Sequence, residues 1–148
     1  IAVTALAMDS HGNVYAATLA EGKIFKISAE KKETAEFCRL RAPYIWALVV
    51  DKDDHLFAGT GPDGKIYRIS SDGKPEEWYA TEVSNILSLA LDADGSLLAG
   101  GSDRGLLYRV TNKNKGVVQV DGRMVERMHA EMARRTVAIA DAIGAMRD

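Results

Sequence analysis

The chain has 148 residues, of which 47% are hydrophobic and 27% are charged, a composition typical of a folded globular domain. It carries 19 basic and 21 acidic residues, giving a formal net charge of −2, so it lacks the dense positive charge that nucleic-acid binding requires. Charged residues interrupt every window of about 20 residues, which excludes a transmembrane helix. We therefore expect neither a nucleic acid nor a membrane as partner, and the composition points to no particular cellular compartment.

An internal repeat dominates the first 120 residues. Three segments align without gaps at intervals of 42 and 41 residues: residues 3–9 (VTALAMD), 45–51 (IWALVVD) and 86–92 (ILSLALD). Each is followed by two further apolar runs, the second reading KIFKI, KIYRI or LLYRV, and by a weaker fourth run reading EFC, EWY or VVQV. Short runs of this composition, separated by turn residues, are typical of β-strands. Four antiparallel strands every 41 or 42 residues is the period of a propeller blade.

The sequence thus predicts an all-β fold of three four-stranded β-propeller blades, a half-propeller, followed by one C-terminal α-helix. The blades should cover about residues 1–43, 44–84 and 85–120. An aspartate closes the first hairpin of every unit, at Asp9, Asp51 and Asp92. Because these residues recur at equivalent positions, we expect them to stabilise turns rather than to form one metal site.

The repeat also resembles a known group of proteins. An apolar run, then Asp-x-x-Gly-x-hydrophobic-x-Ala/Gly, then Gly-x-Ile-Tyr-Arg-Ile is similar to the NHL-type and sugar-lactonase-type six-bladed propellers. The resemblance covers residues 1–120 and implies the architecture. It does not select an activity, because such propellers include hydrolases, sensor domains and binding scaffolds.

Residues 121–148 differ in pattern from the repeats. They predict an amphipathic helix with an N-cap at Asp121 and one apolar stripe. We expect this stripe to pack on the propeller or on a sister helix as an oligomer interface, through Met128, Met132, Ile139, Ile143 and Met146. The segment weakly resembles the C-terminus of citrate-lyase-β-type aldolases, where such a helix belongs to a subunit contact.

Three blades do not close a ring, because propellers have about four to eight blades. The two uncovered blade faces require a partner. Either two copies pair to give six blades, or the chain belongs to a longer propeller, or another protein supplies the remaining blades.

No sequence motif of a catalytic site stands out. Gly-x-Ser-x-Gly, Walker and His-Glu-x-x-His strings are absent from the sequence, and the three histidines are not expected to converge. Cys38 occupies the same repeat position as Tyr79, which indicates a half-buried, inert thiol. The sugar-lactonase resemblance implies a calcium site made of Glu, Asn and Asp from different blades, and we cannot assemble that set. We therefore expect no catalytic residue, no metal site and no cofactor.

A recognition surface is easier to identify than a reaction centre. Tyr44 and Trp46 stand at the start of an inner strand, where propellers open their central channel. Asn85 lies at the equivalent place in the next unit, and Glu82 lies just before it. Residues that vary at equivalent positions are where a repeat protein encodes a particular ligand. The competing interpretation is that Trp46 fills space between blades.

The sequence-based hypothesis is a non-catalytic propeller module that binds a protein or a small ligand and is completed by oligomerisation or by further blades. One alternative is a part of a calcium-dependent lactonase-like hydrolase. A second is an engineered or fused half-propeller with a purely structural role.

Overall fold

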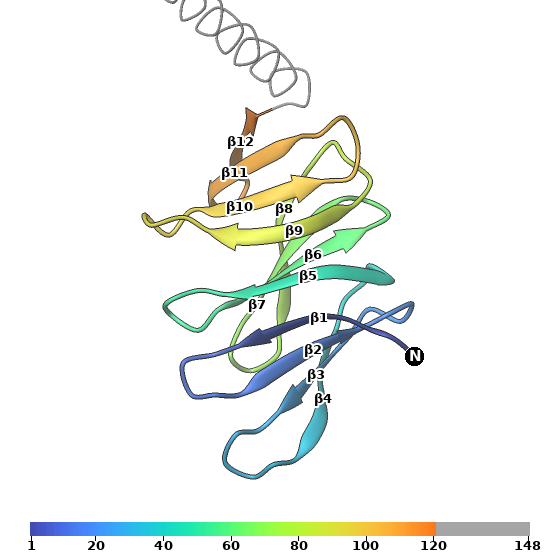
Figure 1. The fold of residues 1–148 in the computed structure, drawn as a ribbon, viewed down its shortest axis with the longest axis vertical. Helices are drawn as coiled ribbons and strands as arrows, with labels where there is room; N and C mark the ends of the chain where they lie inside the picture. Colours follow the sequence, from blue (N-terminus) through green and yellow to red (C-terminus); the bar gives the residue numbers. More distant parts are fainter. Residues whose placement is uncertain (121–148) are drawn as a thin grey trace, which may run out of the picture.

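The computed structural model describes residues 1–120, which form three four-stranded antiparallel sheets (Figure 1). Within each sheet the strands follow one another in sequence order. Blade 1 contains β1 (Val3–Met8), β2 (Val14–Thr18), β3 (Lys23–Ile27) and β4 (Thr34–Arg39). Blade 2 contains β5 (Tyr44–Val50), β6 (Leu56–Gly61), β7 (Lys65–Ile69) and β8 (Pro75–Ala80). Blade 3 contains β9 (Ile86–Leu91), β10 (Leu97–Gly101), β11 (Leu107–Asn112) and β12 (Lys115–Val120).

This architecture confirms the expected all-β fold of three four-stranded sheets. The helix expected over residues 121–148 lies outside the described residues, as do Met128, Met132, Ile139, Ile143 and Met146. Residues 1–120 contain no helix long and apolar enough to cross a membrane.

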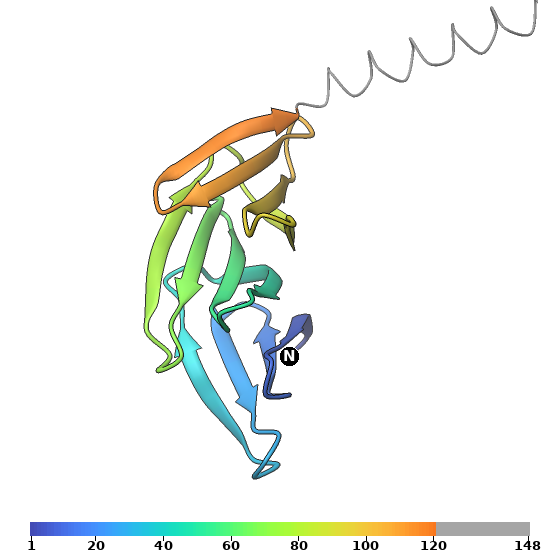
Figure 2. The same ribbon diagram turned by 90° about the vertical axis from the view of Figure 1, so that its left-hand side faces the viewer.

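The blades stack face to face along an arc (Figure 2). The first strands of the blades, β1, β5 and β9, lie next to one another on its concave side, and the last strands, β4, β8 and β12, lie on its convex side. In a propeller the concave side borders the central channel, so β1, β5 and β9 are the inner strands.

Two apolar cores hold the blades together, one at each junction. The core between blades 1 and 2 buries Tyr15, Ala17, Ile24, Ile45, Leu56, Ala58 and Ile69, together with Cys38 and Tyr67. The core between blades 2 and 3 buries Phe57, Ile66, Val83, Ile86, Leu97, Ala99, Tyr108 and Val110. Blade 2 therefore contributes to both cores, and all six residues of its strand β6 are buried.

Candidate functional site

The inner strands share a β-bulge near their start. In β1 the pairing with β2 passes from Val3 to Ala5 and skips Thr4, and in β5 the pairing with β6 skips Trp46 in the same way. In β9 the pairing with β10 passes from Ile86 to Ser88 and skips Leu87. A bulge turns its extra side chain away from the regular alternation of the sheet. The bulges thus release three equivalent side chains from the usual alternation between the two faces of the sheet: Thr4, Trp46 and Leu87.

The bulge side chains of blades 1 and 2 each bond to the next blade. The Thr4 hydroxyl donates to the carbonyl oxygen of Ile45 at 2.5 Å. The Trp46 indole N–H donates to Oδ1 of Asn85 at 2.9 Å. A Cβ atom on Gly61 would lie 1.9 Å from that same Asn85 oxygen and 2.9 Å from the indole nitrogen. The Trp46–Asn85 bond therefore depends on glycine at position 61.

Tyr44 stacks on Trp46 beside this bond. The two ring centroids are 5.7 Å apart with an interplanar angle of 21°. Tyr44 remains 37% exposed, and Trp46 and Asn85 are both half-buried. We call these three residues the aromatic patch: Tyr44, Trp46 and Asn85. The patch joins two blades and offers an aromatic surface next to a side-chain amide.

Glu82, the fourth residue of the expected recognition surface, has a different partner. Its side chain is 79% exposed and lies 3.6 Å from the guanidinium of Arg104. An exposed pair of this kind contributes little to stability. Its backbone N–H donates to the Tyr108 hydroxyl at 3.2 Å. The structure thus brings Tyr44, Trp46 and Asn85 together and directs Glu82 towards Arg104.

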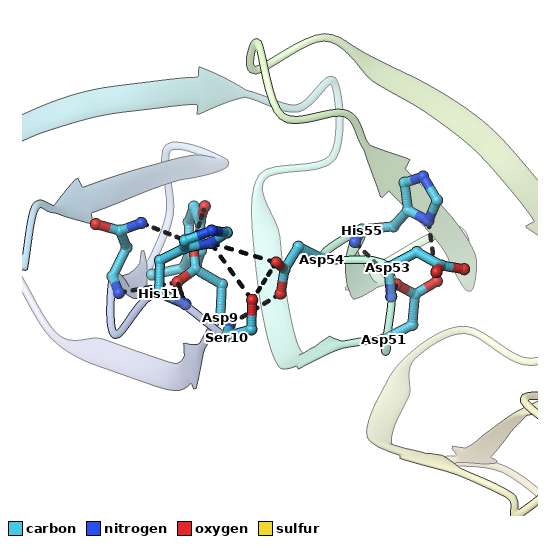
Figure 3. A network of polar contacts seen from close by, with 9 residues as sticks. Asp9, Ser10, His11, Asp51, Asp53, Asp54 and His55 are labelled. Carbon is cyan, nitrogen blue, oxygen red and sulfur yellow. Dashed lines mark hydrogen bonds and ion pairs between the residues drawn. The ribbon is translucent and has the colours of Figure 1, made fainter.

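A cluster of polar side chains lies at the other end of the inner strands from the aromatic patch, in the β1–β2 and β5–β6 turns. Figure 3 shows Ser10 and His11 of blade 1 beside Asp54 of blade 2. The backbone N–H of Ser10 donates to Asp54 at 2.8 Å, the Ser10 hydroxyl also donates to Asp54, and Nδ1 of His11 lies 3.4 Å from Oδ2 of Asp54. Asp54 has a φ of +62°, and its carboxylate reaches Ser10 and His11 of blade 1. The two turns therefore form a polar contact between blades.

The recurring aspartates stabilise these turns, as expected in blades 1 and 2. One oxygen of Asp9 accepts from the backbone N–H groups of His11 and Asn13, and one oxygen of Asp51 accepts equivalently from Asp53 and His55. Blade 3 differs from this pattern. There the N–H of Ser96 donates to Asp94, while Asp92 forms an ion pair with Arg109.

The only group of three potential metal ligands found within 4.8 Å of one another in the described residues is Asp51, Asp53 and His55. Both oxygens of Asp51 already take part in hydrogen bonds, because Oδ1 accepts two backbone N–H groups and Oδ2 lies 3.0 Å from Nδ1 of His55. Calcium prefers six to eight oxygen ligands, which an imidazole does not supply. The group therefore fits a hydrogen-bonded turn better than a calcium site, and it lies away from the aromatic patch.

Neither Cys38 nor the described histidines form a nucleophilic centre in residues 1–120. Cys38 is buried, and burial raises the pKa of its thiol to about 12, which keeps the thiol protonated at neutral pH. His11 and His55 lie in the β1–β2 and β5–β6 turns of adjacent blades. Their nearest partners are the turn carboxylates of Asp54 and Asp51.

These observations define the class of protein: residues 1–120 are consecutive blades of a β-propeller. A virginiamycin B lyase from Staphylococcus aureus has a similar fold, with a TM-score of 0.70 and 18% identity over 78% of this chain and 40% of that chain. A gluconolactonase from Xanthomonas campestris gives 0.65 and 14%, over 79% of this chain and 46% of its own. A regucalcin from Agrobacterium tumefaciens, a calcium-binding protein, gives 0.63 and 14%, over 76% of this chain and 47% of its own.

The similarity establishes the fold and agrees with the resemblance inferred from the repeats. The chain spans less than half the length of these three solved propellers. No protein-family model and no curated protein matches the sequence.

Proposed function

We propose that this chain is a non-catalytic binding module whose ligand rests on the aromatic patch. The observation that carries the proposal is the stacked Tyr44–Trp46 pair, held partly exposed at the start of an inner strand. An aromatic ring favours ligands with a flat apolar face, and its contact with such a face excludes water from both.

The patch is also held in place before any ligand binds. The Trp46 indole is fixed by Asn85, so little side-chain entropy is lost when a ligand covers it. Within residues 1–120 no hydrogen bond uses the amide nitrogen of Asn85, which leaves a donor beside the rings. The ligand class is therefore a small molecule or side chain with a flat apolar face and a hydrogen-bond acceptor at its edge.

Titration of the ¹⁵N-labelled chain tests this proposal by NMR. The probes are methyl β-glucopyranoside and N-acetyltyrosine amide, both of which have a flat face and an acceptor. We expect one of them to shift the Trp46 indole signal, which is distinguished from that of Trp78 by Trp78→Phe. Replacement of Tyr44 by Ala should weaken binding about tenfold, since a lost aromatic contact of about 1.4 kcal/mol corresponds to that factor.

The matched control is Val118→Ala, which truncates a side chain on the outer strand of blade 3 that is 48% exposed. It should leave the affinity unchanged. The proposal fails if neither probe shifts the Trp46 signal, or if Tyr44→Ala binds as the parent does. It also fails if the chain hydrolyses gluconolactone with a stoichiometric calcium ion, because the lactonase-like alternative then holds.

A further inference from the structure

The front face of blade 1 exposes positions that are buried in the other two blades. We define the front face of a blade as the sheet face that packs on the preceding blade, and the back face as the one that packs on the following blade. Val3 is 59% exposed, whereas the equivalent Ile45 and Ile86 are both fully buried. Leu6 is 63% exposed, whereas the equivalent Leu48 is 9% exposed.

The same comparison extends across the front face. Met8 is 62% exposed, and its equivalents Val50 and Leu91 are partly buried against the inter-blade cores. Phe25 and Ile27 are half-buried, whereas their equivalents Tyr67 and Ile69 are buried in the core between blades 1 and 2. Blade 1 thus carries an apolar front face of the kind that blades 2 and 3 bury.

The back face of blade 3 is the counterpart of this surface. Leu98 and Leu107 are half-buried, whereas their equivalents in blade 2, Phe57 and Ile66, are buried against blade 3. Blade 1 buries Tyr15 and Ile24 at the same two positions against blade 2. The first and last blades of residues 1–120 therefore carry two apolar faces that correspond to the two sides of the internal junctions.

The bulge residue of blade 3 also suits the residues at the start of blade 1. Trp46 has Asn85 as its acceptor on the next blade, and the residue equivalent to Asn85 in blade 1 is Ala2. Leu87, the bulge residue of blade 3, is apolar and 50% exposed. An apolar bulge side chain fits a blade that offers Ala2 and Val3 in place of an asparagine.

We propose that the back face of blade 3 binds the front face of blade 1 of a second copy, and that two copies close a ring through two such junctions. Each junction would repeat the packing already present between blades 1 and 2 and between blades 2 and 3. The contact is heterologous, and a heterologous contact closes only when the rotation per copy fits a whole ring. The chain covers 40% of the virginiamycin B lyase chain and 46% and 47% of the gluconolactonase and regucalcin chains, so two copies would together match most of a single-chain propeller of this kind.

Light scattering during size-exclusion chromatography tests this arrangement. We expect the 148-residue chain to elute with twice its mass of 16.1 kDa. Leu6→Glu should reduce the mass to that of one chain, because it places an unpaired carboxylate in both junctions. Leu98→Lys should do the same from the opposite face. Tyr44→Glu, an exposed position on the middle blade, is the matched control and should remain a dimer.

Mixing the two variants tests which faces meet. A pair of one Leu6→Glu chain and one Leu98→Lys chain has one unaltered junction and one junction in which the carboxylate meets the ammonium group. We therefore expect the equimolar mixture to regain the dimer mass, while circular dichroism shows that each separate variant keeps its β-sheet signal.

Four results would overturn the proposal. These are a parent chain with the mass of one copy, open assemblies larger than two copies, a Leu6→Glu chain that stays dimeric, and a mixture that does not reassociate. A parent chain with the mass of one copy would leave the two faces to blades of another chain. A Leu6→Glu chain that stays dimeric would place the dimer contact elsewhere.

Discussion

Asp9 forms more hydrogen bonds than its equivalents in the other two blades. Besides the backbone N–H groups of His11 and Asn13, it accepts from the Asn13 side-chain amide at 2.8 Å and from the Tyr15 hydroxyl at 3.1 Å. Burial alone would raise the pKa of the Asp9 carboxyl, but these donors together outweigh it and hold the pKa below its usual value. Burial and the Asp9 carboxylate both raise the pKa of Tyr15, so its hydroxyl stays a donor.

We therefore predict that Asp9 stabilises the folded chain at neutral pH and that this contribution is lost in acid. A carboxyl whose pKa is lower in the folded chain stabilises fully above its unfolded pKa, about 3.9, and loses that contribution as pH falls through the folded pKa. Asp9→Asn should lose about 2 kcal/mol of unfolding free energy at pH 7, since hydrogen bonds to a charged group are worth roughly 1.5–3 kcal/mol. The difference in unfolding free energy between Asp9→Asn and the parent chain should narrow below about pH 4. Urea unfolding at several pH values measures both, and a gap that does not change with pH contradicts the prediction.

At the scale of elements, the repeat predicted the strands well because alternating apolar residues and turn residues are local signals. The register of the bulges was not predictable in this way. The bulge residues Thr4, Trp46 and Leu87 share the second position of the aligned runs but no side-chain type, so nothing in the runs marks which residue leaves the ladder. The sequence could not predict the Trp46–Asn85 bond or the Ser10–Asp54 contact either. Each joins two blades, and the stacking of the blades sets the distance between the two residues. The sequence named Tyr44, Trp46 and Asn85 only by their repeat position.

The hydrogen bond of Thr4 to the next inner strand should contribute measurably to the free energy of unfolding. Thr4→Val keeps the shape of the side chain and removes the hydroxyl that donates to the Ile45 carbonyl. We expect a loss of about 1 kcal/mol in unfolding free energy, the usual net value of one intramolecular hydrogen bond. The control is Thr111→Val, because the Thr111 hydroxyl is exposed and its 3.3 Å bond to Lys115 stays within one hairpin. Equal losses in the two variants would show that the bond between blades carries no special weight.

At the scale of the whole molecule, stability is distributed along the arc rather than around one centre. Within residues 1–120 each blade packs only on its neighbours, so among these residues blade 2 is covered on both faces and blades 1 and 3 on one face each. Local opening should therefore be easiest at the two ends of the arc.

Hydrogen exchange measures this gradient directly. In the Leu6→Glu chain, whose terminal faces are expected to stay uncovered, amides of β6 should exchange at least about tenfold more slowly than those of β2 and β10, which corresponds to about 1.4 kcal/mol of extra opening free energy. Equal protection in the three strands would contradict a gradient along the arc. If two copies close a ring as proposed, the difference in the parent chain should shrink as protein concentration rises, because a second copy would cover both end blades.

The aromatic patch is built from blades 2 and 3 of one chain, so it does not need ring closure to form. A ring of two copies would carry the patch twice, related by a two-fold axis along the channel. A ligand with two equal binding groups and a suitable spacer would then engage both sites, and its second contact would form at a high effective concentration. Weak binding at each patch would become tight binding of a symmetric or repeated ligand.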